Sequence, residues 1–278
     1  MNIVINLARS DKGDPAFYSR WEMFGKVLSY IPQNKYELDC VKVLVVDQYT
    51  TVDNKFIGQF PKLKVVATPT TGLTHIKEPL KVPVISLKGD RAFLNKITSV
   101  SEFTTMSILK LAKDVADPPL KIAGKTLGII GMGRLGKLVK KAAKGLDMKV
   151  IHYEKGMKEY ALDFLLWKSD FISIHCDENP TSKNLLTEKK LKLIRANAFV
   201  INTSRPSILD EKALLRALEA GLIKGAALDT TNLKFDPVYQ PPPKNLIVTP
   251  HIAGRSIEDR ISTCEYLVEK VGNSGYTL

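Results

Sequence analysis

The feature that most constrains this chain is a short apolar segment that runs into a glycine-rich turn and then into a helical pattern. Thr126–Ile130 reads TLGII, and the turn GMGRLG follows it directly at residues 131–136. From Leu135 to Leu146 the apolar residues recur at helical spacing. A buried strand, a glycine turn and a helix in this order predict parallel α/β structure.

The glycine spacing of this turn is that of a dinucleotide-binding loop. Gly131 allows a tight turn, Gly133 lets the backbone approach a pyrophosphate, and Gly136 allows the helix to pack closely on the strand. Arg134 and Leu135 then lie at the N-terminus of the helix, where free N–H groups and the helix dipole attract phosphate. We therefore expect these five residues to contact a dinucleotide cofactor.

An acidic residue after the next predicted strand favours NAD as that cofactor. Glu154 directly follows the predicted strand Lys149–Tyr153. It lies roughly 20 residues after the glycine turn, which is where a carboxylate binds the ribose hydroxyls of NAD. A carboxylate at this position also repels the 2′-phosphate of NADP. Lys155 is a counter-signal, because a neighbouring cation tolerates that phosphate, so the strictness of the preference for NAD stays open.

The rest of the chain repeats the same alternation of apolar strands and helical segments, which predicts parallel sheets covered by helices. A helical segment at Ser99–Lys113 precedes the glycine-turn strand and places a domain boundary near residue 98, and the last helix is expected at Ser256–Val271. The other predicted strands are Asn2–Asn6, Val41–Val46, Leu63–Ala67, Val84–Ser86, Phe171–His175, Phe199–Asn202, Ile223–Leu228 and Leu246–Thr249.

Composition excludes several classes of protein. The 278 residues carry a net charge of +12, but the cations are scattered, without a charged block or interleaved aromatics, which argues against a nucleic-acid partner. The longest apolar runs are strand-length, which argues against a membrane partner. The three cysteines, Cys40, Cys176 and Cys264, are widely spaced, and the N-terminal residues do not resemble a secretory signal. We expect a cytoplasmic protein with reduced cysteines and no metal site.

Two polar side chains follow predicted strands at positions where parallel sheets bind ligands. Arg205 comes just after Phe199–Asn202, and His251 comes just after Leu246–Thr249. An arginine binds a carboxylate with two parallel hydrogen bonds, and a histidine exchanges a proton near neutral pH. Taken alone, either residue is equally compatible with a structural role, but together they suit chemistry on a small carboxylic acid.

At this point the sequence resembles the D-isomer-specific 2-hydroxyacid dehydrogenase family. The matching stretches occur in family order along most of the chain. They include KLKVVATPTTGLTHI, GKTLGIIGMGRLGK, SDFISIHCDENPTSKNLL, FVINTSR, LDEKALLRALEAGLIKGAALD and NLIVTPHIAG.

The resemblance implies a fold, a reaction and an assembly. The fold is α/β, with two Rossmann- or flavodoxin-like domains of parallel sheet and a cofactor and substrate cleft between them. Residues 1–97 with 256–278 would form the substrate domain, and residues 98–255 would form the NAD-binding Rossmann domain. The reaction is hydride transfer between NAD(H) and a small D-2-hydroxy or 2-keto acid, and the assembly is a homodimer.

The resemblance also implies roles for individual residues. Arg205 would hold the substrate carboxylate, and His251 would act as the acid and base. Backbone N–H groups of Thr71, Gly72 and Leu73 would bind the substrate carboxylate. The remaining implied cofactor contacts are Thr104, Cys176, Thr203 and Asp229, of which Asp229 would bind the nicotinamide carboxamide.

The sequence departs from the family pattern in ways that affect the expected mechanism. The family has a Glu before a Pro, shortly after GAALD, that pairs with the catalytic His. Here an ungapped count places Lys234 there, whereas a short insertion places Asp236 there, before Pro237. Asp236 is the better match, because a carboxylate fixes the tautomer of the imidazole and raises its pKa.

The alternative function is a non-catalytic NAD(H)-binding sensor or regulator on the same fold.

Three other departures affect the substrate region. Pro206 replaces the Gly that usually follows the arginine, and Phe103 replaces a His in the helix between the domains. Thr68 stands where some members carry an arginine before the substrate loop, which counts against a phosphorylated substrate. The identity of the 2-hydroxy acid is not fixed by these residues.

Overall fold

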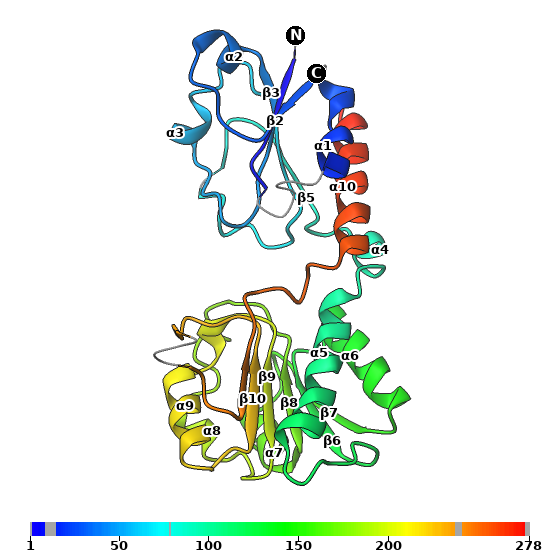
Figure 1. The fold of residues 1–278 in the computed structure, drawn as a ribbon, viewed down its shortest axis with the longest axis vertical. Coiled ribbons are helices and arrows are strands. Elements are labelled where there is room, and N and C mark those ends of the chain that lie inside the picture. Colours follow the sequence, from blue (N-terminus) through cyan, green and yellow to red (C-terminus); the bar gives the residue numbers. More distant parts are fainter. Residues whose placement is uncertain (1, 9–14, 78, 237–240, 276–278) are drawn as a thin grey trace. The chain divides into compact units, whose positions relative to one another are not determined.

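The computed structural model describes residues 2–8, 15–77, 79–236 and 241–275, and its chain divides into two units (Figure 1). Unit 1 comprises residues 1–96 with 255–278, and unit 2 comprises residues 97–254. These bounds differ by one residue from the domain bounds expected from the sequence. The chain therefore leaves unit 1 once, completes unit 2, and returns to unit 1 with its last helix.

Unit 1 contains a five-stranded parallel sheet with the order β2-β1-β3-β4-β5. Four of its strands lie within two residues of predicted ones, whereas the three-residue edge strand β2 is not among the predictions. Its first residue, Lys26, is exposed, and only Leu28 is buried, so it lacks the apolar run of a central strand. The strands are β1 (Ile3–Asn6), β2 (Lys26–Leu28), β3 (Val41–Val45), β4 (Val65–Thr68) and β5 (Val84–Ser86).

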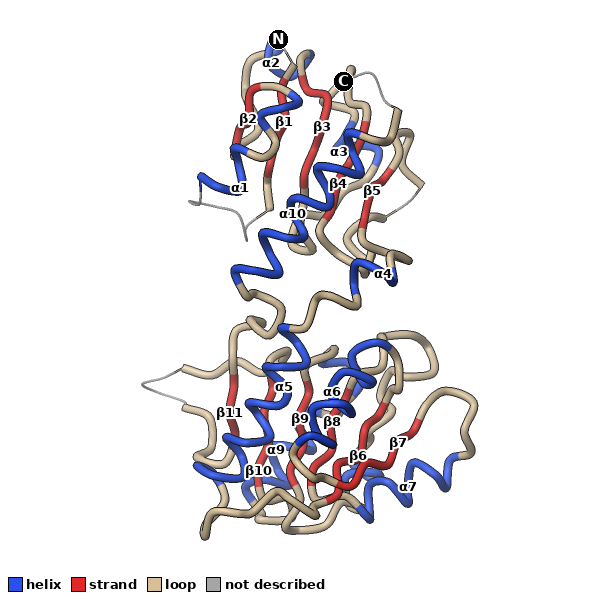
Figure 2. Tube along the Cα trace, turned by 90° about the vertical axis from the view of Figure 1, so that its right-hand side faces the viewer, coloured by secondary structure: helices blue, strands red, loops and turns tan. Residues whose placement is uncertain are grey.

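The last helix, α10 (Ile257–Gly272), contacts β4 and β5 of this sheet (Figure 2). It begins one residue after the predicted start, because Ser256 is its N-cap and accepts a hydrogen bond from Asp259 N at 3.3 Å. At its other end Lys270 pairs with Asp90 at 2.6 Å. The shorter helices of unit 1 are α1 (Pro15–Ser19), the 3₁₀ helix η2 (Glu22–Phe24), α2 (Lys35–Asp39), α3 (Asn54–Ile57) and α4 (Arg91–Leu94).

Unit 2 contains a six-stranded sheet, also parallel, with the order β11-β10-β9-β8-β6-β7. Every strand agrees with a predicted strand to within two residues. The strands are β6 (Thr126–Ile130), β7 (Lys149–Tyr153), β8 (Phe171–Ile174), β9 (Phe199–Asn202), β10 (Gly225–Leu228) and β11 (Leu246–Val248). The helices are α5 (Ser99–Lys110), the π-helical turn η3 (Leu111–Val115), α6 (Arg134–Gly145), α7 (Glu159–Lys168), α8 (Glu188–Leu191), the 3₁₀ helix η4 (Pro206–Ile208) and α9 (Glu211–Glu219).

Helices cover both faces of the second sheet and bury two separate hydrophobic clusters. Leu127 and Ile129 of β6 face α5 and α6, and Ile130 faces the side that α7, α8 and α9 cover. Figure 2 shows α5 and α6 together on one face of this sheet. The fold class predicted from the alternating pattern is confirmed: both sheets are parallel α/β sheets. Across the described ranges no helix combines the length and the apolar character that crossing a bilayer requires.

Candidate active site

The predicted site residues of unit 2 gather at one edge of its sheet. Because all six strands are parallel, the loops that follow them leave from the same edge. Strand β6 lies inside the sheet, with β7 on one side and β8 on the other, so the chain reverses its direction of winding there. Such a switch point leaves a crevice at the carboxyl ends of the strands, which is where open α/β sheets bind ligands.

The glycine turn after β6 has the backbone geometry that the sequence predicts. Gly131 has a φ of 99°, and a Cβ atom there would lie 2.5 Å from Cys176 N, so only glycine fits. A Cβ atom on Gly136 would overlap the carbonyl oxygen of Gly131, because α6 begins directly against the turn. At Gly133 nothing lies within 4 Å of the ideal Cβ position. The open space beside Gly133, at the N-terminus of α6, fits a pyrophosphate.

This contrast between the glycines gives a prediction about binding and folding. Gly133→Ala is expected to fold like the wild type, because its methyl group meets only open space, and to bind NADH at least about tenfold more weakly, because the methyl group occupies that space. Thermal unfolding and a fluorescence titration with NADH measure the two effects. Gly145→Ala, in the last turn of the same helix and also in open space, is the control with unchanged affinity. Unchanged affinity in Gly133→Ala would contradict the assignment of this turn to the cofactor.

Arg134 lies within this turn, and Glu154 follows the neighbouring strand β7. Arg134 is half-buried, and its Nη1 donates to Ile97 O at 2.7 Å, which ties the start of α6 to the start of α5. Glu154 directly follows β7 and is exposed. A carboxylate at the tip of the strand beside β6 matches the position predicted for the ribose contact.

Hydrogen bonds join the predicted cofactor residues Thr104 and Thr203 to each other, and Cys176 to Ser204. The Thr104 hydroxyl donates to Val100 O at 2.8 Å, so in its 3.2 Å contact with the Thr203 hydroxyl it is the acceptor. Thr104 has no exposed surface, and its hydroxyl group contacts the loop after β9 through Thr203. Ser204 Oγ donates to Cys176 O at 2.5 Å and ties the loops after β9 and β8 together. Burial raises the pKa of the Cys176 thiol to about 11, so it stays protonated.

A buried asparagine that the sequence analysis missed holds the loop that carries Arg205. Asn202, the last residue of β9, has no exposed surface. Its Oδ1 accepts from Ser204 N at 3.0 Å, and its Nδ2 donates to Arg205 O at 3.0 Å. The Arg205 side chain is exposed, and its Nη1 donates to Ser204 O at 2.9 Å. An Asn at the end of an otherwise apolar strand is a sequence signal for such a loop anchor.

Asp229 holds the loop that carries His251. Asp229 is 2% exposed. Oδ1 accepts from Thr249 Oγ1 at 2.7 Å and from Ile252 N at 2.8 Å, and Oδ2 accepts from Ala253 N at 3.0 Å. His251 itself has a φ of 55°, which few residues other than glycine adopt, and its N–H donates to Asp229 O at 2.9 Å. The contact of Asp229 with a nicotinamide stays a prediction.

The loop from Thr230 to Asp236 carries the two candidates for the partner of His251. Lys234 and Asp236 are both exposed, and Pro237 lies outside the described residues, so the choice between them stays open. The loop is anchored by Glu211, whose Oε2 accepts from Asn232 N at 2.9 Å. Glu211 is buried, and that burial raises the pKa of its carboxyl group.

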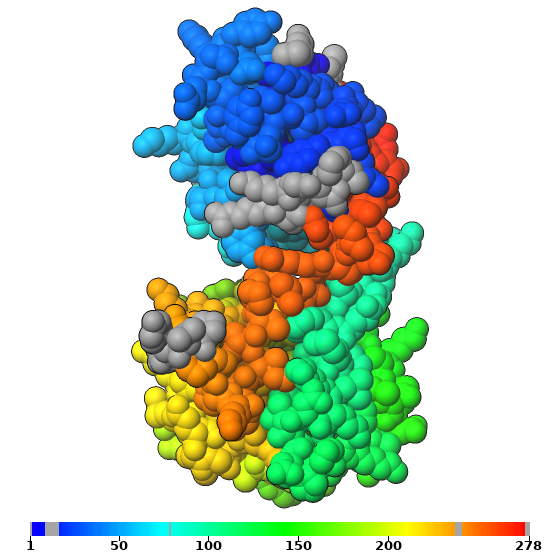
Figure 3. Space-filling view, viewed as in Figure 1, coloured from blue at the N-terminus to red at the C-terminus, as the bar shows by residue number. Residues whose placement is uncertain are grey.

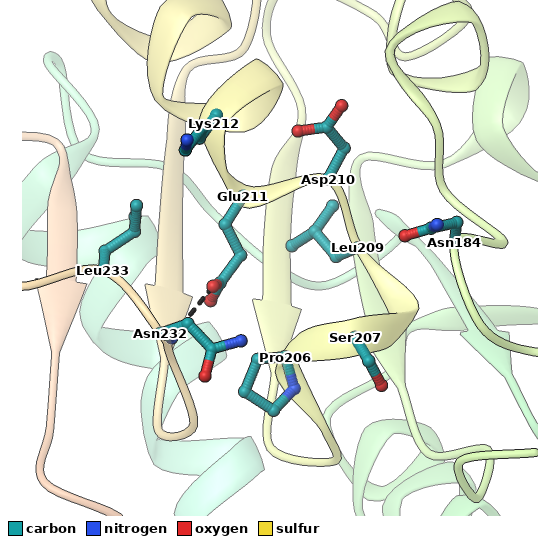
Figure 4. Close-up of a pocket in the computed structure, with 9 residues that line it drawn as sticks. All are labelled: Asn184, Pro206, Ser207, Leu209, Asp210, Glu211, Lys212, Asn232 and Leu233. Atoms are coloured by element: carbon teal, nitrogen blue, oxygen red, sulfur yellow. Dashed lines mark hydrogen bonds between the residues drawn. The ribbon is translucent and has the colours of Figure 1, made fainter.

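An open pocket of about 420 Å³ lies beside these loops (Figure 4). None of the predicted catalytic or cofactor-binding residues lines it, so it is distinct from the crevice beside the glycine turn. In Figure 4 Glu211 points toward Asn232 inside the ring of lining residues. The lining residues are Asn184, Pro206, Ser207, Leu209, Asp210, Glu211, Lys212, Asn232 and Leu233.

The residues around β11, which precede His251 in the chain, lie at the surface of unit 2. In the space-filling view the residues around β11, coloured orange, lie at the surface alongside the green of α5 (Figure 3). His251 belongs to this segment and is half-buried. In the part of the chain that the structure describes, no group of His, Cys, Asp and Glu side chains is arranged to hold a metal ion.

His175, next to the predicted contact Cys176, is a buried histidine. It directly follows β8, and its Nε2 lies 2.6 Å from the Ser173 hydroxyl. Burial lowers its pKa to about 4, because the imidazolium ion would lose its hydration. The ring is therefore neutral in the folded protein at any pH above about 5.

The lowered pKa of His175 predicts a loss of stability at acid pH. The unfolded chain binds a proton at this histidine near pH 6.5, whereas the folded chain binds it only near pH 4, so stability falls as the pH falls through that window. The full effect is about 3 kcal/mol of the free energy of unfolding. Urea unfolding at pH 7.5 and 4.5 measures it. His175→Asn is expected to weaken this pH dependence and His152→Asn, on strand β7, to leave it unchanged; equal slopes in wild type and His175→Asn would contradict the prediction.

In unit 1 the predicted substrate loop follows β4. Thr71 and Gly72 are exposed, and Leu73 is half-buried. The loop is held at both ends by backbone bonds, because Leu87 N donates to Thr70 O at 3.2 Å and Ile76 N donates to Leu73 O at 3.0 Å. This loop also lies at the carboxyl edge of a parallel sheet, which matches a ligand-binding position in that unit.

Comparison with known proteins identifies the family. Residues 96–253 match the family described as D-isomer specific 2-hydroxyacid dehydrogenase, NAD binding domain. The chain is 33% identical over 270 residues to the glyoxylate reductase of Thermococcus litoralis. The aligned region covers 84% of this chain and 80% of that protein. It is 40% identical over 167 residues to the glycerate dehydrogenase of Methylorubrum extorquens, over 55% of this chain and 51% of that one.

A solved structure shows the same fold. The D-lactate dehydrogenase from Aquifex aeolicus, complexed with NAD and lactic acid, aligns with a TM-score of 0.76 at 23% identity, over 98% of this chain and 94% of that one. The family match and the curated relatives confirm the predicted family, enzyme class and NAD cofactor, whereas the roles of single residues stay predictions. This chain belongs to the D-isomer specific 2-hydroxyacid dehydrogenase family, and its residues 96–253 are the NAD-binding domain of that family.

Proposed function

We propose that this protein is an NAD(H)-dependent reductase of a small 2-keto acid, or equally the dehydrogenase of the matching D-2-hydroxy acid. The observation that carries the proposal is the placement of two loops at one sheet edge. Arg205 follows β9 and His251 follows β11, at the same edge as the glycine turn after β6. Each of these two loops is fixed by a buried side chain, Asn202 in one and Asp229 in the other.

NADH, when bound, supplies the hydride for the carbonyl carbon of the keto acid. The residues of the glycine turn and Glu154 are those that would hold it. The Arg205 guanidinium binds the substrate carboxylate and stabilises the negative charge that develops on the carbonyl oxygen. The His251 imidazolium then gives its proton to that oxygen, which yields the hydroxy acid and a neutral imidazole.

The substrate class follows from chemistry and from the named relatives. Glyoxylate reductase and glycerate dehydrogenase are named for acids of two and three carbons, which makes small, unphosphorylated keto acids the first candidates. Thr68 supports the absence of a phosphate group, because it presents no charge beside the predicted substrate loop.

We also propose a homodimer, on the basis of the family resemblance, and light scattering after gel filtration tests it.

A NADH-oxidation assay over 2-keto acids of graded size and charge tests the proposal. Glyoxylate, hydroxypyruvate, pyruvate and phenylpyruvate form the panel, with NADPH in parallel because Lys155 leaves the preference for NAD open. We expect turnover of at least one small keto acid with NADH. NADH binding without turnover of any keto acid would instead favour the non-catalytic sensor.

A further inference from the structure

A chain of hydrogen bonds runs behind the predicted substrate loop of unit 1. Thr70 Oγ1 donates to Gly72 O at 2.8 Å. The Thr68 hydroxyl lies 3.0 Å from the Thr70 hydroxyl and 3.2 Å from His75 Nε2. All of these groups belong to residues 68–75, so the hydrogen bonds span the loop from Thr68, the last residue of β4, to His75.

The direction of every bond in this chain is fixed by the number of protons. A hydroxyl group carries one proton, and that of Thr70 is already donated to Gly72 O. The Thr68 hydroxyl must therefore donate to Thr70, and it can only accept from His75. It follows that the His75 ring carries its proton on Nε2.

The surroundings of His75 agree with a neutral ring in this tautomer. The residue is 4% exposed, and its Nδ1 is buried without a hydrogen-bond partner in the described part of the chain. A proton on Nδ1 would therefore have no acceptor. Burial is the largest influence on the ring and lowers its pKa below the ordinary value.

The hydrogen bonds of this loop involve its carbonyl groups. The carbonyl groups of Thr70, Gly72 and Leu73 all accept bonds from within unit 1. By contrast, among residues 2–8, 15–77, 79–236 and 241–275 no hydrogen bond takes the N–H of Thr71, Gly72 or Leu73. Successive N–H groups without acceptors are available to bind an anion.

We propose that His75 is a positioning residue for the substrate, which acts through Thr68 and Thr70 to hold the N–H groups of residues 71–73 in place for the substrate carboxylate. This inference rests on the proposed function, because it assumes that a 2-keto acid binds there. His75 does not touch the substrate. Its proton on Nε2 starts the series of bonds that ends at the Gly72 carbonyl group.

Substitutions at Thr68 test this role, because its side chain is fully buried and serves as the link. Thr68→Val keeps the shape of the side chain but removes the hydroxyl group, and Thr68→Ser keeps the hydroxyl group. In Thr68→Val we expect KM for the preferred keto acid to rise about 10- to 100-fold with kcat within about threefold, since the carboxylate is bound alike in the ground and transition states. Thr68→Ser is expected to restore KM to within about threefold of wild type.

Further measurements separate positioning from simple loss of structure. The melting temperatures of both variants are compared, and NADH affinity is expected to stay unchanged in both. Oxamate, an unreactive analogue of a 2-keto acid, is titrated in the presence of NADH and should bind to Thr68→Val about 10- to 100-fold more weakly. An unchanged KM and oxamate affinity in Thr68→Val, or an equal loss in both variants, would overturn the inference.

Nitrogen-15 NMR of the histidine rings tests the tautomer without any turnover. We expect His75 to carry its proton on Nε2 at pH 7, and a proton on Nδ1 would overturn the hydrogen-bond scheme. In Thr68→Val the Nε2 proton loses its acceptor, so its resonance should shift. If the wild type binds oxamate and has the Nε2 tautomer but turns over no keto acid, the proposed reaction fails while the positioning role survives.

Discussion

Arg205→Ala is expected to lower kcat/KM for the preferred 2-keto acid by about 10³-fold or more. The guanidinium group offers two parallel N–H donors to a carboxylate, and it also stabilises charge that grows on the carbonyl oxygen in the transition state. The exposed Arg205 side chain reaches out from a loop whose backbone Asn202 fixes at two points. The loss should appear in both KM and kcat, because one function is binding and the other is stabilisation of the transition state.

Two further variants make this result specific. Arg205→Lys keeps the charge but not the planar pair of donors, and we expect it to recover only part of the activity. Arg216→Ala is the matched control, because Arg216 is an exposed arginine of the same unit that pairs with Glu188 at 2.9 Å on the helices α8 and α9. Its kinetics should equal those of the wild type. A kcat/KM within about threefold of wild type in Arg205→Ala would exclude the proposed clamp.

His251→Asn is expected to lower kcat by about 10²- to 10⁴-fold while NADH affinity stays within about threefold. The imidazole is the proposed proton donor to the carbonyl oxygen, and an amide cannot replace it. Asparagine is the right substitution because the residue has a φ of 55°, a conformation that asparagine tolerates better than most side chains. The loop bonds of Asp229 to Ile252 N and Ala253 N therefore stay intact.

The pH dependence of the rate distinguishes a proton donor from a residue that only shapes the site. Reduction by the wild type should slow as the pH rises and the imidazole loses its proton, and His251→Asn should lack this alkaline decline. His152→Asn, on strand β7, is the control and should keep it. An alkaline decline of unchanged shape in His251→Asn would assign the proton transfer to another group.

The same assay settles the partner of His251. Asp236→Asn and Lys234→Met are compared, because the sequence allows either residue to occupy the place of the usual carboxylate. A lower kcat in Asp236→Asn alone identifies Asp236, which can accept a hydrogen bond from the imidazole. A lower kcat in Lys234→Met alone identifies Lys234, and unchanged values in both show that the imidazole works without either.

The elements that the sequence predicted well are those with a local physical cause. Strands such as Thr126–Ile130 and Phe199–Asn202 agree with the prediction to the residue, because a buried parallel strand needs a short run of apolar side chains on both faces. The edge strand Lys26–Leu28 was missed because it is half-exposed and three residues long. The predicted helix Ser99–Lys113 is α5 followed by a π-helical turn. The spacing of apolar residues that predicts a helix does not distinguish the π-helical turn from the α-helix before it.

By itself the sequence determined the glycine turn, the two parallel sheets and the positions of Arg205, Glu154 and His251 at strand ends. These depend on residues that are close together in the chain, so spacing alone is enough to predict them. Asn202 holds the Arg205 loop through residues two and three positions away, whereas the contacts that only the tertiary structure decided join residues far apart in the sequence. Asp229 reaches the N–H groups of Ile252 and Ala253, and Ser204 reaches Cys176 O, because parallel strands bring their carboxyl ends to one edge.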